Sequence, residues 1–403
     1  MTADKTDVSL WSPLRNRLFR SLWAANAVSN LGTWMQGMAA ALLMAQLTHS
    51  AQMVALLQAA TTWPVFLLVI PAGHLADRQD RPTLLLAAHS LRAFGALGLA
   101  LVTSIGLVTP WLLLFCMSVI GAGVAIAMPA WQAASSTLVE PEQIHSAAAL
   151  NGMSFNVARA IGPVIAGLLA QMTIMATIFW ISGASVFAPI MMFWRWRAAS
   201  QAQREQSRKP AHRISPLGFA DIISRSDFRT LLLRCFICFF GASVMWSLLP
   251  AFAVLTLHLK PAALGWLMGI IGGGALLGGV WLPMLKAKYG LNILIAVASG
   301  LLGLALLLAA WDDSMFMIWI SMLLTGIGWA FIVSGLNGAA QIMFPKEMRA
   351  RAISTYLMVM YGGTTSGSIL WGYLAAYSGL KSSFMIAGLV LISSTLLSLR
   401  WRL

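Results

Sequence analysis

Four charged side chains stand within five residues in the stretch Gly73-His-Leu-Ala-Asp77-Arg78-Gln-Asp80-Arg81-Pro82. Acids and bases at this spacing can form ion pairs, either with one another or with a partner segment. Two long apolar segments, 52–72 and 83–104, flank the stretch. Because charged groups are costly in hydrocarbon, we expect this turn to lie at a membrane face, between two spanning helices.

Two arginines fall near the middle of predicted helices. Arg159 lies in the apolar segment 147–171, and Arg92 lies in the segment 83–104. An arginine inside a membrane is rare and is a functional candidate by default. For Arg159 two interpretations stay open: an anion anchor or gate element in a central cavity, and a structural hydrogen bond to Asn156 or to backbone carbonyls. For Arg92, which follows His89 by three residues, we favour the structural interpretation.

All twelve Asp and Glu residues lie outside the interiors of the predicted helices. A buried carboxylate is the usual partner of a cation in the membrane, so this distribution argues against a strongly cationic substrate. Cys235 and Cys238 are predicted to pack in the core, and we expect no metal site and no cofactor. The sequence has no His-Glu-x-x-His motif and no Gly-x-x-x-x-Gly-Lys-Ser/Thr loop. We therefore predict a protein that is not an enzyme, with a polytopic membrane enzyme as the remote alternative.

The elements that position these residues are predicted to be membrane helices. The chain has 403 residues, of which 59% are hydrophobic and 9% charged. A spanning helix needs about 20 mostly apolar residues. Such segments predict twelve spanning helices in two sets of six, near 19–45, 52–72, 83–104, 110–136, 147–171, 175–194, 229–257, 262–284, 290–310, 314–342, 351–377 and 382–400.

The basic residues predict the orientation of the chain. Of the 26 Lys and Arg residues, only Lys260 and Lys381 fall in the loops assigned to the outer side. The positive-inside rule therefore places both termini in the cytoplasm. The predicted organisation is an N-terminal six-helix bundle (1–194), a basic cytoplasmic linker (195–228) and a C-terminal six-helix bundle (229–403). We expect the linker to lie on anionic lipid rather than on nucleic acid.

The two halves repeat each other at an offset of 205 residues. Seven pairs of similar residues share this offset: Gly121 with Gly326, Gly123 with Gly328, Gln132 with Asn337, Ala133 with Gly338, Glu142 with Glu347, Gly162 with Gly367, and Gly167 with Gly372. Agreement of this extent over about 50 residues indicates a duplicated six-helix unit.

Polar residues on one face of the first predicted helix indicate an internal cavity. Asn26, Asn30, Thr33, Trp34 and Gly37 share that face at helical spacing. Amides cannot be satisfied by lipid, so the face should line the interior. The candidate substrate-binding residues are Asn26, Asn30, Trp34, Gln132, Arg159, Trp246, Asn337 and Tyr361. Each alone is also compatible with ordinary helix packing.

The charged turn resembles the Gly-x-x-x-Asp-Arg-x-Gly-Arg-Arg/Lys loop between helices two and three of the major facilitator superfamily. Gly73, Asp77, Arg78 and Arg81 match, whereas Asp80 and Pro82 depart from the pattern. The fifth predicted helix resembles the Gly-x-x-x-Gly-Pro-x-x-Gly-Gly motif of superfamily exporters. Gly162-Pro163 match there, and Ala158 and Ala166 replace two glycines.

The resemblance implies an inner gate in the form of a charged latch. In the family the matching aspartate and arginine hold the cytoplasmic side closed. By analogy, Asp77 could meet the start of the helix near residue 350, and Arg78 and Arg81 could pair with Glu140, Glu142 or Glu347. The expected gating residues are Gly73, Asp77, Arg78, Arg81, Glu142, Gly162 and Pro163.

Several short segments of the N-terminal half resemble the superfamily branch that contains enterobactin-type siderophore exporters. Two of these segments are Ser29-Asn30-Leu-Gly-Thr-Trp34 and Pro129-Ala-Trp131-Gln132. The resemblance implies a monomeric secondary transporter of a bacterial cytoplasmic membrane, in contact with lipid and driven by a proton gradient. The expected function is export of a neutral or anionic amphipathic small molecule by alternating access. An uptake carrier and a lysophospholipid flippase of the same fold stay open as alternatives.

Overall fold

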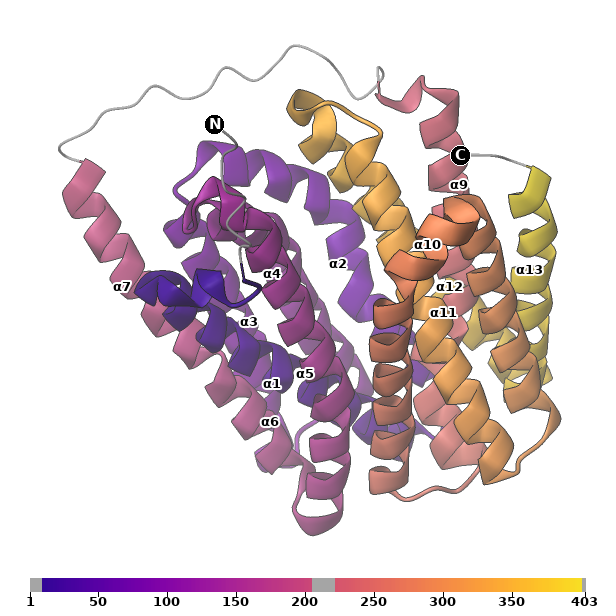
Figure 1. Cartoon of the computed structure of the whole chain (residues 1–403). Helices are drawn as coiled ribbons and strands as arrows, with labels where there is room; N and C mark the ends of the chain where they lie inside the picture. The colour runs from indigo at the N-terminus through magenta and orange to yellow at the C-terminus, as the bar shows by residue number, and fades with distance from the viewer. Residues whose placement is uncertain (1–8, 205–221, 401–403) are drawn as a thin grey trace.

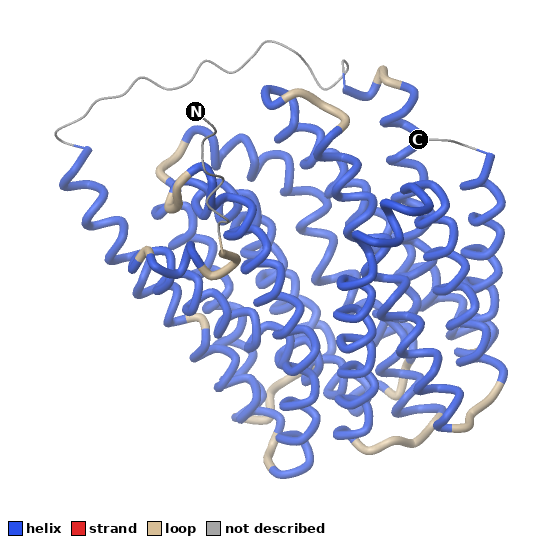
Figure 2. Tube along the Cα trace, in the orientation of Figure 1, coloured by secondary structure: helices blue, strands red, loops and turns tan. Residues whose placement is uncertain are grey.

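The computed structural model describes residues 9–204 and 222–400, except for the side chains of 77, 78, 199–204, 346, 347, 350 and 396–400. The described part of the chain contains helices and short loops and no strand (Figure 2). Its elements in chain order are η1 (Ser12–Arg15), α1 (Arg17–Thr48), α2 (Ala51–Arg78), α3 (Arg81–Ser104), α4 (Pro110–Thr137), η2 (Pro141–Gln143), α5 (Ile144–Met172), α6 (Met175–Ser185), α7 (Phe187–Arg204), α9 (Ser226–Ala251), the π-helical turn η3 (Phe252–Thr256), α10 (Pro261–Trp311), α11 (Met315–Ile342), α12 (Lys346–Ser378) and α13 (Leu380–Arg400).

The predicted spans coincide with these helices. The span 175–194 is divided between α6 and α7 at Val186, and α7 continues to Arg204, inside the range predicted as the linker. The spans 262–284 and 290–310 together form α10, which bends at Gly290, where φ is +77°. A positive φ is readily adopted only by glycine, so this residue marks the turn between two helices.

Eight helical segments of the described chain are long and apolar enough to cross a membrane, one of them the 51-residue α10. Helices α1 and α12 are not among the eight, although each covers a predicted span. Both carry polar side chains that lower their hydropathy, such as Asn26 and Asn30 in α1 and Thr364 and Thr365 in α12. Thr364 and Thr365 are buried, as expected of polar residues that face other helices.

The turn between α2 and α3 is built differently from the superfamily pattern. Asp80 is the N-cap of α3, and its side-chain oxygen accepts hydrogen bonds from the backbone N–H and the hydroxyl of Thr83, at 3.3 and 2.8 Å. Pro82 lies in the first turn of α3, where a missing N–H costs nothing. A helix cap therefore ends the turn where the superfamily pattern has a glycine.

Consecutive helices reverse direction, which gives the molecule two ends. We call the end that holds the α2–α3 turn, the α4–α5 turn and the last residues of α7 the linker end, and the other the opposite end. Figure 1 shows α1 to α7 gathered on the left and α9 to α13 on the right. Contacts between the two groups run mainly through α2 with α12 and α5 with α10.

The duplicated unit is visible in the helix bounds and in the glycine contacts. Helices α4 and α11 have 28 residues each, and adding 205 to 110 and 137 gives 315 and 342, the bounds of α11. A Cβ atom at Gly123 would meet Ala88 and Arg92 of α3, and one at Gly328 would meet Ala298 and Leu302 in the second part of α10. Equivalent glycines therefore face equivalent helices.

The same holds at the contacts between the halves. A Cβ atom at Gly167 would lie 2.6 Å from the carbonyl oxygen of Pro261 in α10. One at Gly372 would lie 2.6 Å from Cβ of Ala55 in α2. In the duplicated unit, α5 corresponds to α12 and α2 corresponds to the first part of α10. The contact of α5 with α10 is therefore equivalent to the contact of α12 with α2.

Small residues let α10 and α11 approach closely, which predicts a stability effect. A Cβ atom at Gly326 would overlap the carbonyl oxygen of Ile271 and lie 2.8 Å from the backbone nitrogen of Ala275. Backbone atoms cannot move aside as a flexible side chain can. We expect Gly326→Ala to cost about 1–3 kcal/mol of stability. The check is the thermal unfolding midpoint in detergent. Gly338→Ala on the same helix is the control, because nothing lies within 4 Å of its Cβ position, and equal midpoints for the two variants would contradict the packing argument.

The hydrophobic core differs between the two ends. Near the opposite end, Met35 and Met38–Ala45 of α1 share one continuous apolar cluster with Val244–Ala253 of the second half. Nearer the linker end, the first half has two clusters of its own, around Phe193 and around Phe19, and every member comes from residues 14–196. The halves thus share a common core at the opposite end, and a smaller cluster of Val65, Val69 and Ala125 with Leu357, Met358 and Tyr361 joins α2 and α4 to α12.

Candidate functional site

Aromatic rings from both halves meet near the middle of the structure. The ring centroid of Trp34 on α1 lies 5.7 Å from that of Phe155 on α5 and 6.0 Å from that of Trp246 on α9. Trp246 lies 5.1 Å from Trp329 on α11. We call these four residues the aromatic cluster. Rings at such distances stabilise one another and also form a surface on which a flat apolar ligand can stack.

Arg159 lies beside this cluster. It is one helical turn after Phe155 and three residues before Gly162, whose Cβ position is 2.7 Å from Cβ of Trp34. The arginine side chain is 7% exposed, its Nε is buried, and it makes no hydrogen bond or ion pair with any described residue. The structural interpretation, a hydrogen bond to Asn156 or to a carbonyl, is therefore not seen. A buried cation without a partner is costly, which makes Arg159 a candidate for binding an anion from outside the chain.

One further donor of the aromatic cluster lacks a partner. Nε1 of Trp246 is buried without a hydrogen bond to any described residue. Indole N–H groups usually find an acceptor when they are buried. The indole N–H of Trp246 is therefore a second donor, besides Arg159, that could hold an acceptor oxygen of a ligand.

The predicted polar face of α1 is partly accessible. Asn26 and Asn30 are half-buried, and Gln132 of α4 is exposed. Their side-chain amides make no hydrogen bond to another described residue. Amides with no partner in the chain are expected to face water or a ligand rather than lipid.

Two of the remaining predicted residues, Tyr361 and Asn337, make hydrogen bonds with residues other than Arg159. The hydroxyl of Tyr361 on α12 donates to Sδ of Met128 on α4 at 3.6 Å, one turn before Gln132. Asn337 on α11 accepts from Nε2 of Gln341 at 3.1 Å. Tyr361 thus links the halves on the side of α2 and α4. The structure shows direct ring contacts for Trp34 and Trp246 and none between them and Tyr361.

Arg92 is a partnered buried arginine. Its Nη1 lies 3.2 Å from Nδ1 of His89, and its Nη2 donates to the hydroxyl of Thr33 on α1. The structural interpretation fits these contacts. Arg234 is a third buried arginine. From the sequence it was expected to be one of the basic residues on the cytoplasmic side. It is 3% exposed and donates to Oδ1 of Asn292 at 2.7 Å.

The expected gating residues lie at two places. A Cβ atom at Gly73 would lie 3.3 Å from the hydroxyl of Ser354, so the end of α2 is next to α12 of the other half. Arg81 donates to the carbonyl of Ala133 and the hydroxyl of Thr137, at 2.9 and 3.0 Å. Its guanidinium therefore holds the end of α4 in the same half, instead of the proposed ion pair with an acid. The side chains of Asp77, Arg78 and Glu347 lie outside the described residues.

The other expected gating residues lie in η2 and α5. Glu142 is exposed in η2. Gly162 and Pro163 are buried, Gly162 against α1. The carbonyl oxygen of Pro163 lies 2.6 Å from the Cβ position of Gly265 on α10. Gly162 and Pro163 thus pack on helices of both halves.

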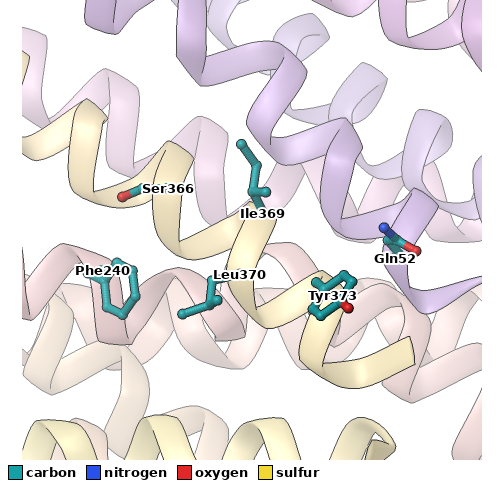
Figure 3. Close-up of a pocket in the computed structure, with 6 residues that line it drawn as sticks. All are labelled: Gln52, Phe240, Ser366, Ile369, Leu370 and Tyr373. Atoms are coloured by element: carbon teal, nitrogen blue, oxygen red, sulfur yellow. The ribbon is translucent and has the colours of Figure 1, made fainter. Parts of the chain in front are cut away.

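A separate pocket of about 510 Å³ lies between α2, α9 and α12, and Figure 3 shows Tyr373 and Gln52 at one end of it and Phe240 and Ser366 toward the other. Ile369 and Leu370 complete the lining, which comes from α2, α9 and α12. None of the predicted substrate residues lines it. It is a groove on the outside of the helices, distinct from the region around Arg159.

The three cysteines lie apart from other residues that could bind a metal ion, within the part of the chain that the structure describes. Cys116, Cys235 and Cys238 are buried and free, and Sγ of Cys238 lies 3.3 Å from the hydroxyl of Ser299. Among the residues that the structure describes, no group of three or more His, Cys, Asp or Glu could hold a metal ion.

Sequence reasoning missed two members of the aromatic cluster. Phe155 precedes Arg159 by four residues, and Trp329 precedes Asn337 by eight, so each shares a helix face with a residue that was selected. The spacing of Phe155 from Arg159 and of Trp329 from Asn337 could have indicated that these aromatic residues belong to the site.

Long apolar helices with a buried, unpaired guanidinium and open amides among them fit a multi-pass membrane transporter. Residues 8–403 match the family described as "Transmembrane secretion effector". The chain belongs to this family of major facilitator transporters.

Known proteins resemble the chain over most of its length. The multidrug efflux pump Tap of Mycobacterium tuberculosis is 24% identical over 372 residues, which cover 89% of this chain and 87% of Tap. The enterobactin exporter EntS of Shigella flexneri is 26% identical over 369 residues, covering 89% and 85%. A solved structure of a POT family transporter in complex with 5-aminolevulinic acid shares the fold, with a TM-score of 0.79, 14% identity and 96% coverage of both chains.

Proposed function

We propose that this protein is a secondary exporter of an amphipathic, neutral or anionic small molecule, and that an anionic group binds at Arg159. The observation that carries the proposal is the guanidinium of Arg159, which is 7% exposed and has no partner among the described residues. The aromatic cluster beside it supplies an apolar surface, so the two together suit a ligand with one charged and one apolar part.

The proposed architecture is twelve spanning helices in two six-helix bundles. It counts α6 with α7 as one span and α10 as two, and includes α1, α12 and α13. The equal lengths of α4 and α11 and the equivalent glycine contacts support two related halves. Basic residues at the linker end support a cytoplasmic position for that end and for both termini, in a bacterial cytoplasmic membrane.

The distribution of contacts supports alternating access. The core shared by both halves lies near the opposite end, and the glycine contacts of α5 with α10 run from Gly167 and Gly265 to Ala160 and Gly272. Beyond that point, Leu276 and Leu277 of α10 and Met153 of α5 are exposed. We assign this conformation to a state sealed on the outside and open toward the cytoplasm.

The direction of transport is proposed from relatives. Tap and EntS are named as an efflux pump and an exporter. The conformation assigned above is open toward the cytoplasm, where an exporter collects its substrate. A siderophore or a drug-like compound is the proposed substrate, and a proton gradient is the proposed driving force. A lysophospholipid flippase is the second candidate, favoured by the pocket between α2, α9 and α12, whose lining includes the exposed apolar side chains Ile369 and Leu370.

A ligand screen followed by vesicle transport tests the proposal. The purified protein is heated with enterobactin, a macrolide, a lysophospholipid, and the matched pair naphthalene sulfonate and naphthalene sulfonamide, which differ in charge but little in shape. A true ligand raises the unfolding midpoint. We expect stabilisation by amphipathic anions, and movement of the same compound in reconstituted vesicles. Stabilisation by the lysophospholipid alone, with lipid transfer between leaflets, would favour the flippase.

The latch at the α2–α3 turn gives a further prediction. Gly73 lies next to Ser354 of α12 in this conformation, and the latch proposal is that Asp77 meets the start of α12 when the inner side closes. We expect Asp77→Asn to fold, with an unchanged unfolding midpoint, and to lower the transport rate about tenfold, since a lost charge–dipole contact of about 1 kcal/mol or more weakens the closed inner gate. The measurement is transport in reconstituted vesicles, and a normal rate would exclude the latch role. Glu142→Gln, in the exposed turn η2, is the matched carboxylate control.

A further inference from the structure

Among the described residues, the helix interiors contain one Asp, Glu or His side chain that can change its charge near neutral pH. Every Asp and Glu of the described chain lies in a loop or within two residues of a helix end. His49, His74, His145 and His258 lie in loops or within four residues of a helix end. His89 is eight residues into α3, about 12 Å from its start at the rise of a helix, and is 1% exposed. Imidazole is the side chain whose ordinary pKa lies between pH 5 and 8.

The contact between His89 and Arg92 fixes the charge of the imidazole in this conformation. A guanidinium has only donors, so Nδ1 of His89 at 3.2 Å from Nη1 must accept a hydrogen bond through its lone pair. The ring is therefore neutral, with its proton on Nε2. A proton added to Nδ1 would occupy the lone pair, remove this hydrogen bond and place two cations side by side.

We propose that His89 is the proton-binding residue of the transport cycle. The inference rests on the proposed function of a proton-driven exporter and names the residue that the coupling needs. A proton from water binds the lone pair of Nδ1 and displaces Nη1 of Arg92, and its later release to water restores the contact. The binding and release of this proton need no other reactant. Nη2 of Arg92 also donates to Thr33, which directly precedes Trp34, so proton binding at His89 acts on the helix that carries the aromatic cluster.

The surroundings of His89 contribute no acid. Helix α3 packs against α4, α6 and α7. Helices α4 and α6 contain no Asp, Glu, His, Lys or Arg, and Cys116 of α4 lies at the level of Gly95. Helix α7 places Phe193 against the His89 ring, at 5.2 Å between centroids, with Arg195 and Arg197 in the next turn. The side chain that reaches it from α1 is that of Thr33, through Arg92. A proton on His89 would thus lie beside the guanidinium of Arg92, with no acid from these helices to compensate it.

The sign of the pH effect follows. The conformation sealed at the opposite end contains the hydrogen bond that requires neutral His89. The proposal includes that α1, which carries Thr33 and shares the core at the opposite end, moves away from Arg92 when that end opens and so releases the contact with His89. With the contact broken the imidazole binds a proton more readily, so the sealed conformation loses stability as the pH falls. Acidification is expected to open the opposite end.

Cysteine labelling tests this without any substrate. Ala41 is buried in the core shared by the halves, and Ala41→Cys reports opening to a membrane-impermeant maleimide added at the opposite end. The rate is divided by that of Ile174→Cys, at the exposed α5–α6 turn, measured at the same pH, because maleimide reacts with the thiolate and the thiolate fraction falls with pH. We expect this ratio to rise about tenfold between pH 8 and pH 5. With His89→Gln, which keeps an acceptor for Arg92 and cannot titrate, the ratio should stay constant. His145→Gln is the control and should behave as the parent does. A pH-dependent ratio that survives His89→Gln, or a parent ratio that does not change with pH, overturns the proposal.

A transport measurement connects the proton to the cycle. Naphthalene sulfonate keeps its charge throughout this pH range, so any pH dependence belongs to the protein. We expect an imposed pH gradient to drive its accumulation by the parent protein, and His89→Gln to exchange it at equal pH without accumulating it. Accumulation by His89→Gln equal to that of the parent overturns the coupling role. A parent that transports none of the screened compounds refutes the proposed function, while the labelling result still decides whether His89 binds the proton.

Discussion

Arg159→Ala is expected to weaken the binding of naphthalene sulfonate about 10- to 100-fold and to leave the binding of naphthalene sulfonamide unchanged. A charge-assisted hydrogen bond contributes about 1.5–3 kcal/mol, which corresponds to this loss of affinity. Since the two compounds differ in charge, the comparison separates loss of the anion contact from general damage to the aromatic cluster. Isothermal titration or a thermal-shift titration in detergent measures both affinities.

The same substitution predicts an effect on stability with a defined sign. The guanidinium of Arg159 makes no hydrogen bond to a described residue, so its removal takes away an uncompensated buried charge. The ligand-free unfolding midpoint of Arg159→Ala should equal that of the parent or exceed it. Arg159→Lys should recover part of the sulfonate affinity, because it keeps the charge without the planar donors. Arg229→Ala, at an exposed position of α9, is the control.

A lower midpoint for Arg159→Ala together with unchanged sulfonate affinity would show that the arginine stabilises the fold, and would remove it from the ligand site.

Gly265→Val is expected to open the seal at the opposite end. The Cβ position of Gly265 lies 2.6 Å from the carbonyl oxygen of Pro163 and 3.2 Å from Cα of Val164, both backbone atoms of α5. A larger side chain there must push α10 away from α5, at a cost of about 1–3 kcal/mol in the sealed conformation. The cost applies only while the two helices touch, so the population shifts toward the open state by roughly tenfold.

Labelling of Ala41→Cys from the opposite end measures this shift. We expect faster labelling in the Gly265→Val background, together with slower net transport, since the cycle needs both conformations. Gly273→Val is the matched control on the same helix, because nothing lies within 4 Å of its Cβ position. If both variants label alike, the contact between α5 and α10 is not part of the seal.

Much of the fold could be predicted from local sequence. A spanning helix is defined by its own apolar length, and the turns between helices carry their own signals, such as Asp80 before Pro82 and glycine at 290. The offset of 205 was also visible, because the glycines that let helices approach closely recur in each half. The structure then showed that Gly123 and Gly328 face equivalent helices.

The candidate site depended on contacts that no local pattern contains. Arg159 and Arg92 look alike in the sequence, each a single arginine in an apolar helix, yet Arg92 is bound by His89 and Thr33 whereas Arg159 has no described partner. Arg81 looked like an ion-pairing residue and instead holds the end of α4. Arg234 looked like a surface base and is buried on Asn292.

By itself, then, the sequence determined the helices, their turns and the relation between the halves, because hydrophobic length, helix caps and close-packing glycines act over a few neighbouring residues. Only the tertiary structure decided which buried arginine is free to bind a ligand, which histidine is held neutral, and which end is sealed. Those properties depend on side chains brought together from helices far apart in the chain, and a hydrogen bond across that distance leaves no periodic signal in the sequence.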